Sequence, residues 1–231
     1  MADDRNLTTI AIDGPAGAGK STVARLLAET LSYLYLDTGA MYRALTWHAI
    51  HEGLDLEDEN ALTELAKRAR IELVPHKDET RVFVNGREVT SEIRSPEVTD
   101  KTWYIDRVPG VREVMVELQR EIGRRGRIVA EGRDMGTVVF PRAVCKIYLD
   151  ASADERARRR WRDLQQRGVD ARLDDVKREI IARDEKTMQR EVAPLRQAED
   201  AIRVDTTDLS IDQVVDAIRV IAESKRSEGE A

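Results

Sequence analysis

The residues with the clearest chemistry form the stretch Gly14–Ser21, which fits the pattern G-x-x-x-x-G-K-[ST]. Glycines in such a loop let the backbone wrap with its N–H groups pointing inward, toward phosphate oxygens. A lysine at this spacing reaches the β- and γ-phosphates, and the following serine hydroxyl can bind Mg²⁺. The motif therefore predicts Lys20 as a catalytic residue, Ser21 as the metal ligand, and a polyphosphate-binding loop made of Gly14, Pro15, Ala16, Gly17, Ala18, Gly19, Lys20, Ser21 and Thr22.

The residues on either side of the loop have the patterns that this motif requires. Residues 8–12 form a short β-branched and apolar run, which predicts a buried strand. After Lys20, apolar residues recur at helical spacing: Val23, Leu26, Leu27, Leu31 and Leu34. The N-terminus of that helix adds a favourable potential for an anion. Strand, loop and helix in this order favour a phosphate site over an incidental glycine-rich turn.

Four further segments have the composition of strands: 33–37, 127–132, 146–151 and 201–206. Helical segments separate them, which predicts an α/β fold with a doubly wound, five-stranded parallel sheet and helices on both faces. Ligands of such sheets bind outside the carboxyl ends of the strands. We therefore expect the site near the polar residues that follow the predicted strands: Asp37, Glu131, Arg133, Asp134 and Asp150.

One region interrupts the alternation of strands and helices. Residues 71–90 have no helical pattern, and Asn85-Gly86 lies between two strand-like runs, which is a hairpin signal. Helices are predicted to start near Asp58 and at Ser95-Pro96. This region therefore reads as a small antiparallel β insertion.

Composition limits the classes of function. The chain has 231 residues and a net charge of −6, yet 35% of its residues are charged, so both signs are interspersed. An acidic total argues against nucleic acid as the main partner. No apolar run approaches the ~20 residues of a membrane span, and the first residues lack the pattern of a secretory signal. With Cys145 as the only cysteine, no intrachain disulfide can form, and we expect a cytoplasmic protein.

Three arginine-bearing stretches indicate what receives the phosphate. The first, residues 37–43, ends in Arg43 one helical turn after a glycine. The second, residues 131–137, places an arginine beside an aspartate and between glycines, which suggests close backbone approach to a ligand. In the third, Arg183 and Arg190 are seven residues apart and are predicted to share one helix face. Two guanidinium groups on one face suit a phosphate between them.

The three histidines, His48, His51 and His76, lie in no motif and are assigned to surface or packing roles.

The phosphate-binding loop together with these arginines resembles the cytidylate kinase family, of the bacterial type with an enlarged nucleotide-binding insertion. The resemblance runs from Ile10 to about Ile221, and "IDGPAGAGKST", "LDTGAMYRA", "VREVM", "GRDMGTVVFP" and "REVAPL" carry it. It implies a P-loop kinase of pyrimidine metabolism that uses Mg²⁺ and transfers the ATP γ-phosphoryl group to CMP or dCMP, giving ADP and CDP or dCDP. We further expect small-molecule partners only, with no nucleic acid, no membrane and a monomeric state.

The resemblance further implies which parts of the chain form the core, the acceptor site and the lid. We expect one domain over residues 1–231, with a core at about 8–57 and 108–224, an acceptor-binding insertion at about 58–107 and a short lid at about 155–172. The basic stretch from Arg156 to Arg162 would close over ATP. The implied catalytic residues are Lys20, Arg133, Arg160 and Arg183, and the implied acceptor-binding residues are Thr38, Tyr42, Arg43, Arg112, Arg133, Asp134, Arg183 and Arg190.

Two positions depart from the family pattern. Trp103 stands where the family usually has a serine near the base, and Thr187 stands at the middle carboxylate of R-D-x-x-D-x-x-R. Neither touches the phosphate-binding residues, so phosphoryl transfer is more firmly indicated than the identity of the acceptor.

Other functions stay open from sequence. One is a kinase for UMP, shikimate or another small acceptor, and another is a regulatory P-loop switch that hydrolyses nucleotide. A guanine-specifying N-K-x-D stretch is absent, which disfavours a GTPase. A nucleic-acid binder that uses the basic stretch 155–167 fits poorly with the acidic total.

Overall fold

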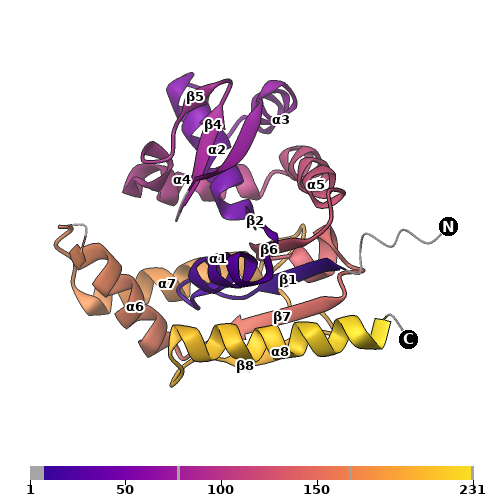
Figure 1. Cartoon of the computed structure of the whole chain (residues 1–231). Coiled ribbons are helices and arrows are strands. Elements are labelled where there is room, and N and C mark those ends of the chain that lie inside the picture. The colour runs from indigo at the N-terminus through magenta and orange to yellow at the C-terminus, as the bar shows by residue number, and fades with distance from the viewer. Residues whose placement is uncertain (1–7, 77–78, 167, 230–231) are drawn as a thin grey trace. The chain divides into compact units, whose positions relative to one another are not determined.

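The computed structural model describes residues 8–76, 79–166 and 168–229 of the chain, which divide into two compact units (Figure 1). The first unit comprises Met1–Tyr35 with Arg125–Ala231, and the second comprises Leu36–Arg124. The second unit is longer than the predicted insertion at 58–107. Residues 77–78 of that insertion and residue 167 of the predicted lid lie outside the described residues.

The first unit is built on a five-stranded sheet with the order β2-β6-β1-β7-β8. β1 pairs in parallel with β6 on one side and β7 on the other, and β7 pairs in parallel with β8. Each strand lies within one residue of its predicted position at either end, so the predicted α/β fold is confirmed. The strand bounds are Thr9–Asp13 (β1), Leu34–Asp37 (β2), Ile128–Gly132 (β6), Cys145–Asp150 (β7) and Ile202–Asp205 (β8).

Two helices cover one face of this sheet. Helix α1 (Lys20–Leu31) and helix α8 (Ile211–Gly229) lie in front of the strands in Figure 1 and share one buried core with β1, β6 and β7. The predicted capping box before α8 is confirmed, because Ser210 N donates to Gln213 Oε1 and Gln213 N donates to Ser210 Oγ. Cys145 is buried in β7, and burial raises its pKa to about 12, so the thiol is an inert packing group.

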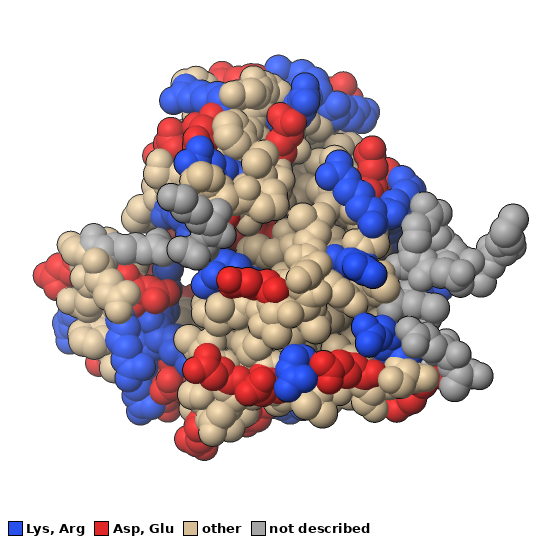
Figure 2. Space-filling view, in the orientation of Figure 1, with Lys and Arg blue, Asp and Glu red and all other residues tan. Residues whose placement is uncertain are grey.

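The remaining helices of the first unit follow the carboxyl ends of the strands. Helix α6 (Ala153–Gln166) and helix α7 (Leu173–Met188) pack on each other, and η3 (Met135–Val139) is a single π turn that follows β6. Figure 2 shows Lys and Arg gathered over α6, with acidic side chains beside them. The interspersed charge predicted from composition is visible on this face.

In its described residues, the second unit combines four α-helices with a small antiparallel sheet. Its elements are α2 (Thr38–His51), α3 (Glu59–Arg68), β3 (Ile71–His76), β4 (Glu79–Val84), β5 (Arg87–Glu88), η2 (Glu92–Arg94), α4 (Pro96–Asp106) and α5 (Pro109–Gly123). The predicted hairpin turn is confirmed between β4 and β5, where Asn85 (φ 51°) and Gly86 (φ 82°) are both left-handed. Asp58 and Ser95 cap α3 and α4 as predicted.

The three histidines belong to this second unit. His48 is buried, its Nε2 lies 3.1 Å from Asn85 Nδ2, and burial lowers its pKa. His51 stacks on Trp47, with 4.9 Å between ring centroids. Their packing and surface roles agree with the prediction.

Within the described part of the chain, no helix is both long enough and apolar enough to cross a membrane.

Candidate nucleotide site

The phosphate-binding loop connects β1 to α1 and lies close to the end of β7. Gly14 has φ 152°, and a Cβ on it would lie only 2.0 Å from the Leu149 carbonyl oxygen, so no side chain fits there. Gly17 has φ 76°, and a Cβ on it would lie 2.9 Å from the Arg156 carbonyl oxygen. The predicted loop therefore adopts a backbone that two of its glycines make possible.

Lys20 lies in the first turn of α1 and is 5% exposed. Its Nζ donates a 2.7 Å hydrogen bond to the Pro15 carbonyl, so the ammonium folds back over the loop. Burial, followed by the positive charge of Arg133, lowers the pKa of Lys20 to about 7, and Arg183 acts in the same direction. Glu131 and Asp184 oppose this shift. Lys20 thus lies within electrostatic reach of two predicted catalytic arginines and of two carboxylates.

Ser21 and Glu131 form the oxygen pair that a metal could use. Ser21 Oγ donates a 2.6 Å hydrogen bond to Glu131 Oε1, which also accepts a 3.4 Å bond from the Tyr35 hydroxyl. Mg²⁺ prefers hard oxygen ligands, and in phosphoryl-transfer sites it keeps water and phosphate oxygens as additional ligands. A hydroxyl beside a carboxylate fits that requirement. Among the described residues, no cluster of three or more His, Cys, Asp or Glu forms a cage for a metal without such ligands.

Arg133 and Asp134 lie between the end of β6 and the π turn η3. Among the residues that the structure describes, Arg133 Nη1 donates only a 3.3 Å bond to the neighbouring Gly132 carbonyl, whereas Asp134 is buried at 3% exposure. The Asp134 carbonyl accepts hydrogen bonds from both Val138 N and Val139 N, at 2.9 and 3.1 Å. Such π turns occur often at functional sites.

Asp13, the last residue of β1, holds the start of this π turn. Its Oδ1 accepts from Met135 N at 2.8 Å and its Oδ2 accepts from Gly136 N at 2.7 Å. Burial is the largest effect on its carboxyl and raises the pKa to about 7, while the two N–H donors oppose that shift. Asp13 was not among the predicted site residues. Its position at the carboxyl end of a central strand was the available signal.

Asp184 and Arg156 clamp the phosphate loop from α7 and α6. Ala16 N donates to Asp184 Oδ1 at 2.8 Å, and Arg156 Nη1 donates to both the Ala16 carbonyl, at 2.8 Å, and Asp184 Oδ2. Arg156 also donates from Nε to the Ala151 carbonyl at 3.0 Å. Both residues are buried: Arg156 is 8% exposed and Asp184 is 6% exposed. Arg156, predicted to belong to a basic stretch closing over ATP, is bonded inside the fold in this structure, and the lid stays a prediction.

The other α6 arginines differ in what they contact. Arg159 donates to Thr206 Oγ1 at 2.9 Å and to the Thr206 carbonyl at 2.6 Å. Arg160 is half-buried, and in the described part of the chain its guanidinium has no hydrogen-bond or ion-pair partner. Arg160 is therefore the predicted catalytic arginine of α6 that remains available to a phosphate.

Arg183 and Arg190 do not share a helix face as predicted. Helix α7 ends at Met188, so Arg183 lies on the helix and Arg190 lies beyond it. Arg190 is 7% exposed, and its guanidinium donates to the carbonyls of Val192 and Ala193, at 2.8 Å for the first. Thr187, also buried, donates from Oγ1 to the Arg183 carbonyl at 2.8 Å.

The other predicted acceptor residues belong to the second unit and gather at the start of α2. Asp37 caps this helix by accepting from Ala40 N at 2.7 Å, and its second oxygen accepts from Arg43 Nη2 at 3.3 Å. The Arg43 guanidinium lies against Gly39, because a Cβ there would approach Arg43 Nη1 to 3.0 Å. Thr38 begins α2 and is buried, at 2% exposure.

Tyr42 and Arg112 form a second pair of predicted acceptor residues within this unit. The Arg112 guanidinium carbon lies 5.5 Å from the centroid of the Tyr42 ring, a cation–π arrangement. Arg112 Nη1 also donates to the Asp106 carbonyl at 3.2 Å, and the residue is 3% exposed. Trp103, the first departure from the family pattern, is half-buried on α4.

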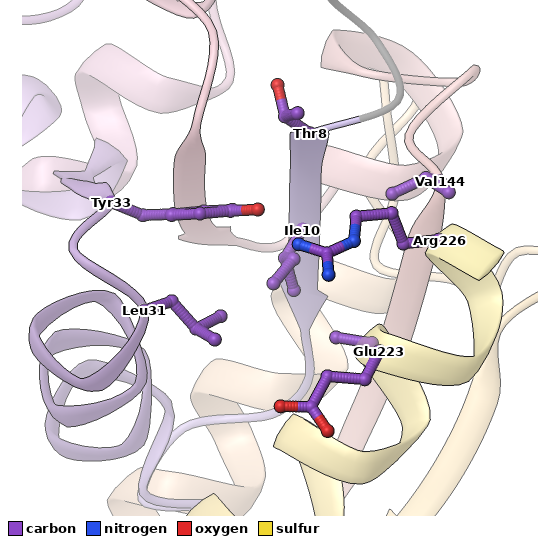
Figure 3. Close-up of a pocket in the computed structure, with 8 residues that line it drawn as sticks. Thr8, Ile10, Leu31, Tyr33, Val144, Glu223 and Arg226 are labelled. Carbon is purple, nitrogen blue, oxygen red and sulfur yellow. The ribbon is translucent and has the colours of Figure 1, made fainter. Parts of the chain in front are cut away.

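A small cavity in the first unit lies away from these residues. Its volume is about 20 Å³, and Thr8, Ile10, Tyr33, Val144 and Arg226 are among its lining residues. Figure 3 shows Tyr33 and Arg226 extending toward each other across it. The cavity adjoins the beginning of β1 and β7, opposite the end where ligands of parallel sheets bind. It has no relation to the phosphate loop.

Comparison with known proteins decides the family. The family model described as "Cytidylate kinase" matches residues 10–224 of the chain. The chain belongs to the cytidylate kinase family. The resemblance predicted from sequence is therefore confirmed.

Individual relatives agree with this membership. The cytidylate kinase of Carboxydothermus hydrogenoformans is 52% identical over 206 residues, which cover 89% of this chain and 93% of that protein. The cytidylate kinase of Geobacillus sp. is 52% identical over 221 residues, which cover 96% and 99%. Among solved structures, an uncharacterized protein from Eubacterium ventriosum matches with a TM-score of 0.51 at 14% identity, over 94% of this chain and 99% of that chain. This last likeness shows the fold alone.

Proposed function

We propose that this member of the cytidylate kinase family transfers the γ-phosphoryl group of ATP to CMP or dCMP, giving ADP and CDP or dCDP. One observation supports the site most directly: a buried Lys20 folds over a glycine loop, and its pKa is lowered to about 7, first by burial and then by the positive charge of Arg133, with Arg183 acting in the same direction. Lys20, Arg133 and Arg183 supply positive charge that can stabilise a polyphosphate, while Glu131 and Asp184 partly balance it.

The donor nucleotide is held by the phosphate loop. The backbone N–H groups of residues 17–21 and the Lys20 ammonium bind the phosphates of ATP, and Arg160 approaches the group in transfer. Ser21, with Glu131 beside it, holds Mg²⁺, which supplies charge neutralisation between the donor phosphates when bound. The protein's own work is positioning and electrostatic stabilisation, because the transition state is loose. No general base is required, because the attacking phosphate oxygen is already ionised.

The acceptor nucleotide is held by arginines and one carboxylate. Arg43, Arg133, Arg183 and Arg190 bind its phosphate in line with ATP, and Thr38 and Tyr42 complete the site. Asp134 accepts from the cytosine N4 amine, while Arg112 or Arg133 donates to N3 and O2. Uracil has an acceptor, O4, in place of the N4 donor, and a donor, N3–H, in place of the N3 acceptor. Each opposed buried pair costs about 1–3 kcal/mol. We therefore expect kcat/KM for CMP to exceed that for UMP by roughly 10² to 10⁴-fold.

Coupled measurement of ADP release with ATP and a panel of nucleoside monophosphates tests this proposal. CMP and dCMP should be used far better than UMP, AMP or GMP, and Asp134→Ala should reduce the CMP/UMP ratio mainly by impairing CMP. Comparable use of UMP and CMP would favour the alternative of a kinase with another acceptor. ATP hydrolysis that no nucleoside monophosphate stimulates would favour the regulatory P-loop switch.

The remaining expectations belong to this proposal as well. We propose that the partners are small molecules and not nucleic acid, that the chain works as a monomer, and that it works in the cytoplasm. The mixed surface charge and the buried, unreactive Cys145 agree with these expectations.

A further inference from the structure

Asp13 contacts the predicted acceptor loop through both its backbone and its side chain. In the sheet, Asp13 is the register partner of Gly132, the last residue of β6. Its carboxylate then accepts from the N–H groups of Met135 and Gly136, the first residues of η3. The two residues between these contacts are Arg133 and Asp134, so Asp13 contacts the chain both before and after them.

The carboxylate has no partner that would explain it as part of an ion pair. Asp13 is 4% exposed and forms no salt bridge within residues 8–76, 79–166 and 168–229. The nearby Lys146 is committed elsewhere, because its Nζ donates to Asp200 and to the Pro141 carbonyl. Burying a carboxylate without an ion pair is costly. The hydrogen bonds that compensate it go to the π turn.

The packing around Gly136 is tight on the side that faces Asp13. A Cβ on Gly136 would lie 3.3 Å from Asp13 Oδ2, 3.3 Å from Lys146 Cδ and 3.5 Å from Ala198 Cβ. Gly136 therefore leaves little room for a side chain, and the hydrogen bonds from Met135 N and Gly136 N hold the turn against the Asp13 carboxylate.

We propose that Asp13 is a positioning residue for the acceptor side of the reaction: its carboxylate fixes the π turn η3 and thereby fixes Arg133 and Asp134 relative to the phosphate loop. This inference rests on the proposed function, which assigns Arg133 and Asp134 to CMP. Asp13 itself touches no substrate. Since Gly14 follows it directly, one residue links the donor loop with the acceptor loop.

The test compares Asp13→Asn with wild type in the full-length enzyme. The amide keeps the size of the side chain but turns one acceptor into an NH₂ group that faces a backbone N–H. We expect the KM for CMP to rise about tenfold or more and the KM for ATP to stay within about threefold, because only the acceptor side loses its geometry. Amide hydrogen exchange at Met135 or Gly136 should become faster, which reports the position of the turn without any reaction.

Two further variants keep the result interpretable. Gly136→Ala disturbs the same contact while leaving Asp13 in place, and it should reproduce both effects even if Asp13→Asn fails to fold. Asp55→Asn changes an exposed carboxylate outside the predicted insertion and lid, where Asp55 Oδ1 accepts from Glu57 N at 2.9 Å. It should leave both KM values and the exchange at residues 135–136 unchanged.

Unchanged exchange at Met135 and Gly136, or an equal rise in KM for both substrates, would overturn the positioning role. Failure of the proposed function gives a different result. If Arg133→Ala and Asp134→Ala leave the KM for CMP at its wild-type value, these residues do not bind the acceptor and the role of Asp13 in catalysis is lost with them. The exchange measurement still decides whether Asp13 holds the turn.

Discussion

The Ala16 backbone N–H donates a 2.8 Å hydrogen bond to Asp184 Oδ1, so the phosphate loop is tied to α7 by a residue 168 positions later in the chain. Arg156 completes the contact by bonding both partners, the Ala16 carbonyl and Asp184 Oδ2. Loop, α6 and α7 therefore share one buried ion pair. Any closing motion of the predicted lid must leave Arg156 in place or break this pair.

Arg156→Met should lower the free energy of unfolding by about 3–5 kcal/mol, because it leaves the Asp184 carboxylate buried without its partner. Urea unfolding monitored by circular dichroism measures the change. The double variant Arg156→Met with Asp184→Asn should lose less than the sum of the single variants. Arg158→Ala, which removes an exposed pair with Glu155 at 3.4 Å, is the control and should cost less than about 1 kcal/mol. Equal effects of Arg156→Met and Arg158→Ala would contradict the clamp.

Lys20→Ala should lower kcat by roughly 10²-fold or more, the loss typical of an electrostatic stabiliser of the transition state. The measurement is ADP release at saturating ATP and CMP, with circular dichroism as the check on folding. Near-normal turnover by the folded variant would remove Lys20 from the donor site.

Arg160→Ala should lower kcat while leaving the free energy of unfolding nearly unchanged, because the guanidinium has no partner in the described part of the chain. An arginine that meets the transferred phosphate adds stabilisation only during transfer, so we expect a loss of about tenfold or more. Arg178→Ala, which changes an exposed arginine of α7 outside the predicted lid, serves as the matched control. If both variants have the same kcat, Arg160 is a surface residue.

Thr187→Asp should change the ratio of kcat/KM for CMP and dCMP, which differ only in the 2′-hydroxyl, because it restores the carboxylate of the family pattern. Thr187→Val should leave the ratio near its wild-type value, because the wild-type hydroxyl already donates to the Arg183 carbonyl. Kinetics with the two acceptors measure both ratios. An unchanged ratio in Thr187→Asp would show that this position does not read the sugar.

Asp13 should make stability depend on pH in a direction unusual for an acid. Its folded-state pKa is raised from 3.8 to about 7, so the unfolded chain releases this proton first as the pH rises. Its contribution to stability is therefore greatest below about pH 4, falls between about pH 4 and 7, and is constant above. Relative to Asp13→Asn, wild type should lose up to about 4 kcal/mol between pH 4 and 8. Urea unfolding of both proteins across this range measures the difference, and a difference that does not vary with pH would place the carboxyl pKa near its ordinary value.

Local signals in the sequence predicted most of the fold. Asn85-Gly86 supplied the two left-handed residues of the hairpin, and Ser210 with Gln213 supplied a capping box. The strands of the sheet were short apolar runs between helices. Each of these features depends on residues that are close together in the chain, which is why composition and spacing were sufficient.

Features that depend on distant residues were not predicted. Asp13 and Asp184 act on backbone groups 122 and 168 positions away, and no spacing rule connects such partners. The end of α7 was also missed, because Gln189 caps the helix without a glycine or a following proline to mark it. The predicted helix therefore continued through Arg190. The π turn at Met135–Val139 has no period that a pattern search would detect.

The order of strands in the sheet has a consequence for how the chain acquires its structure during synthesis. β1 is complete at Asp13, yet its partners in the sheet are β6 and β7, which end at Gly132 and Asp150. The second unit, Leu36–Arg124, is one continuous segment and leaves the ribosome before either partner. Non-local pairing of this kind slows folding, whereas local contacts form early. The phosphate-binding loop, although near the N-terminus, is therefore among the last parts of the molecule to gain its native neighbours.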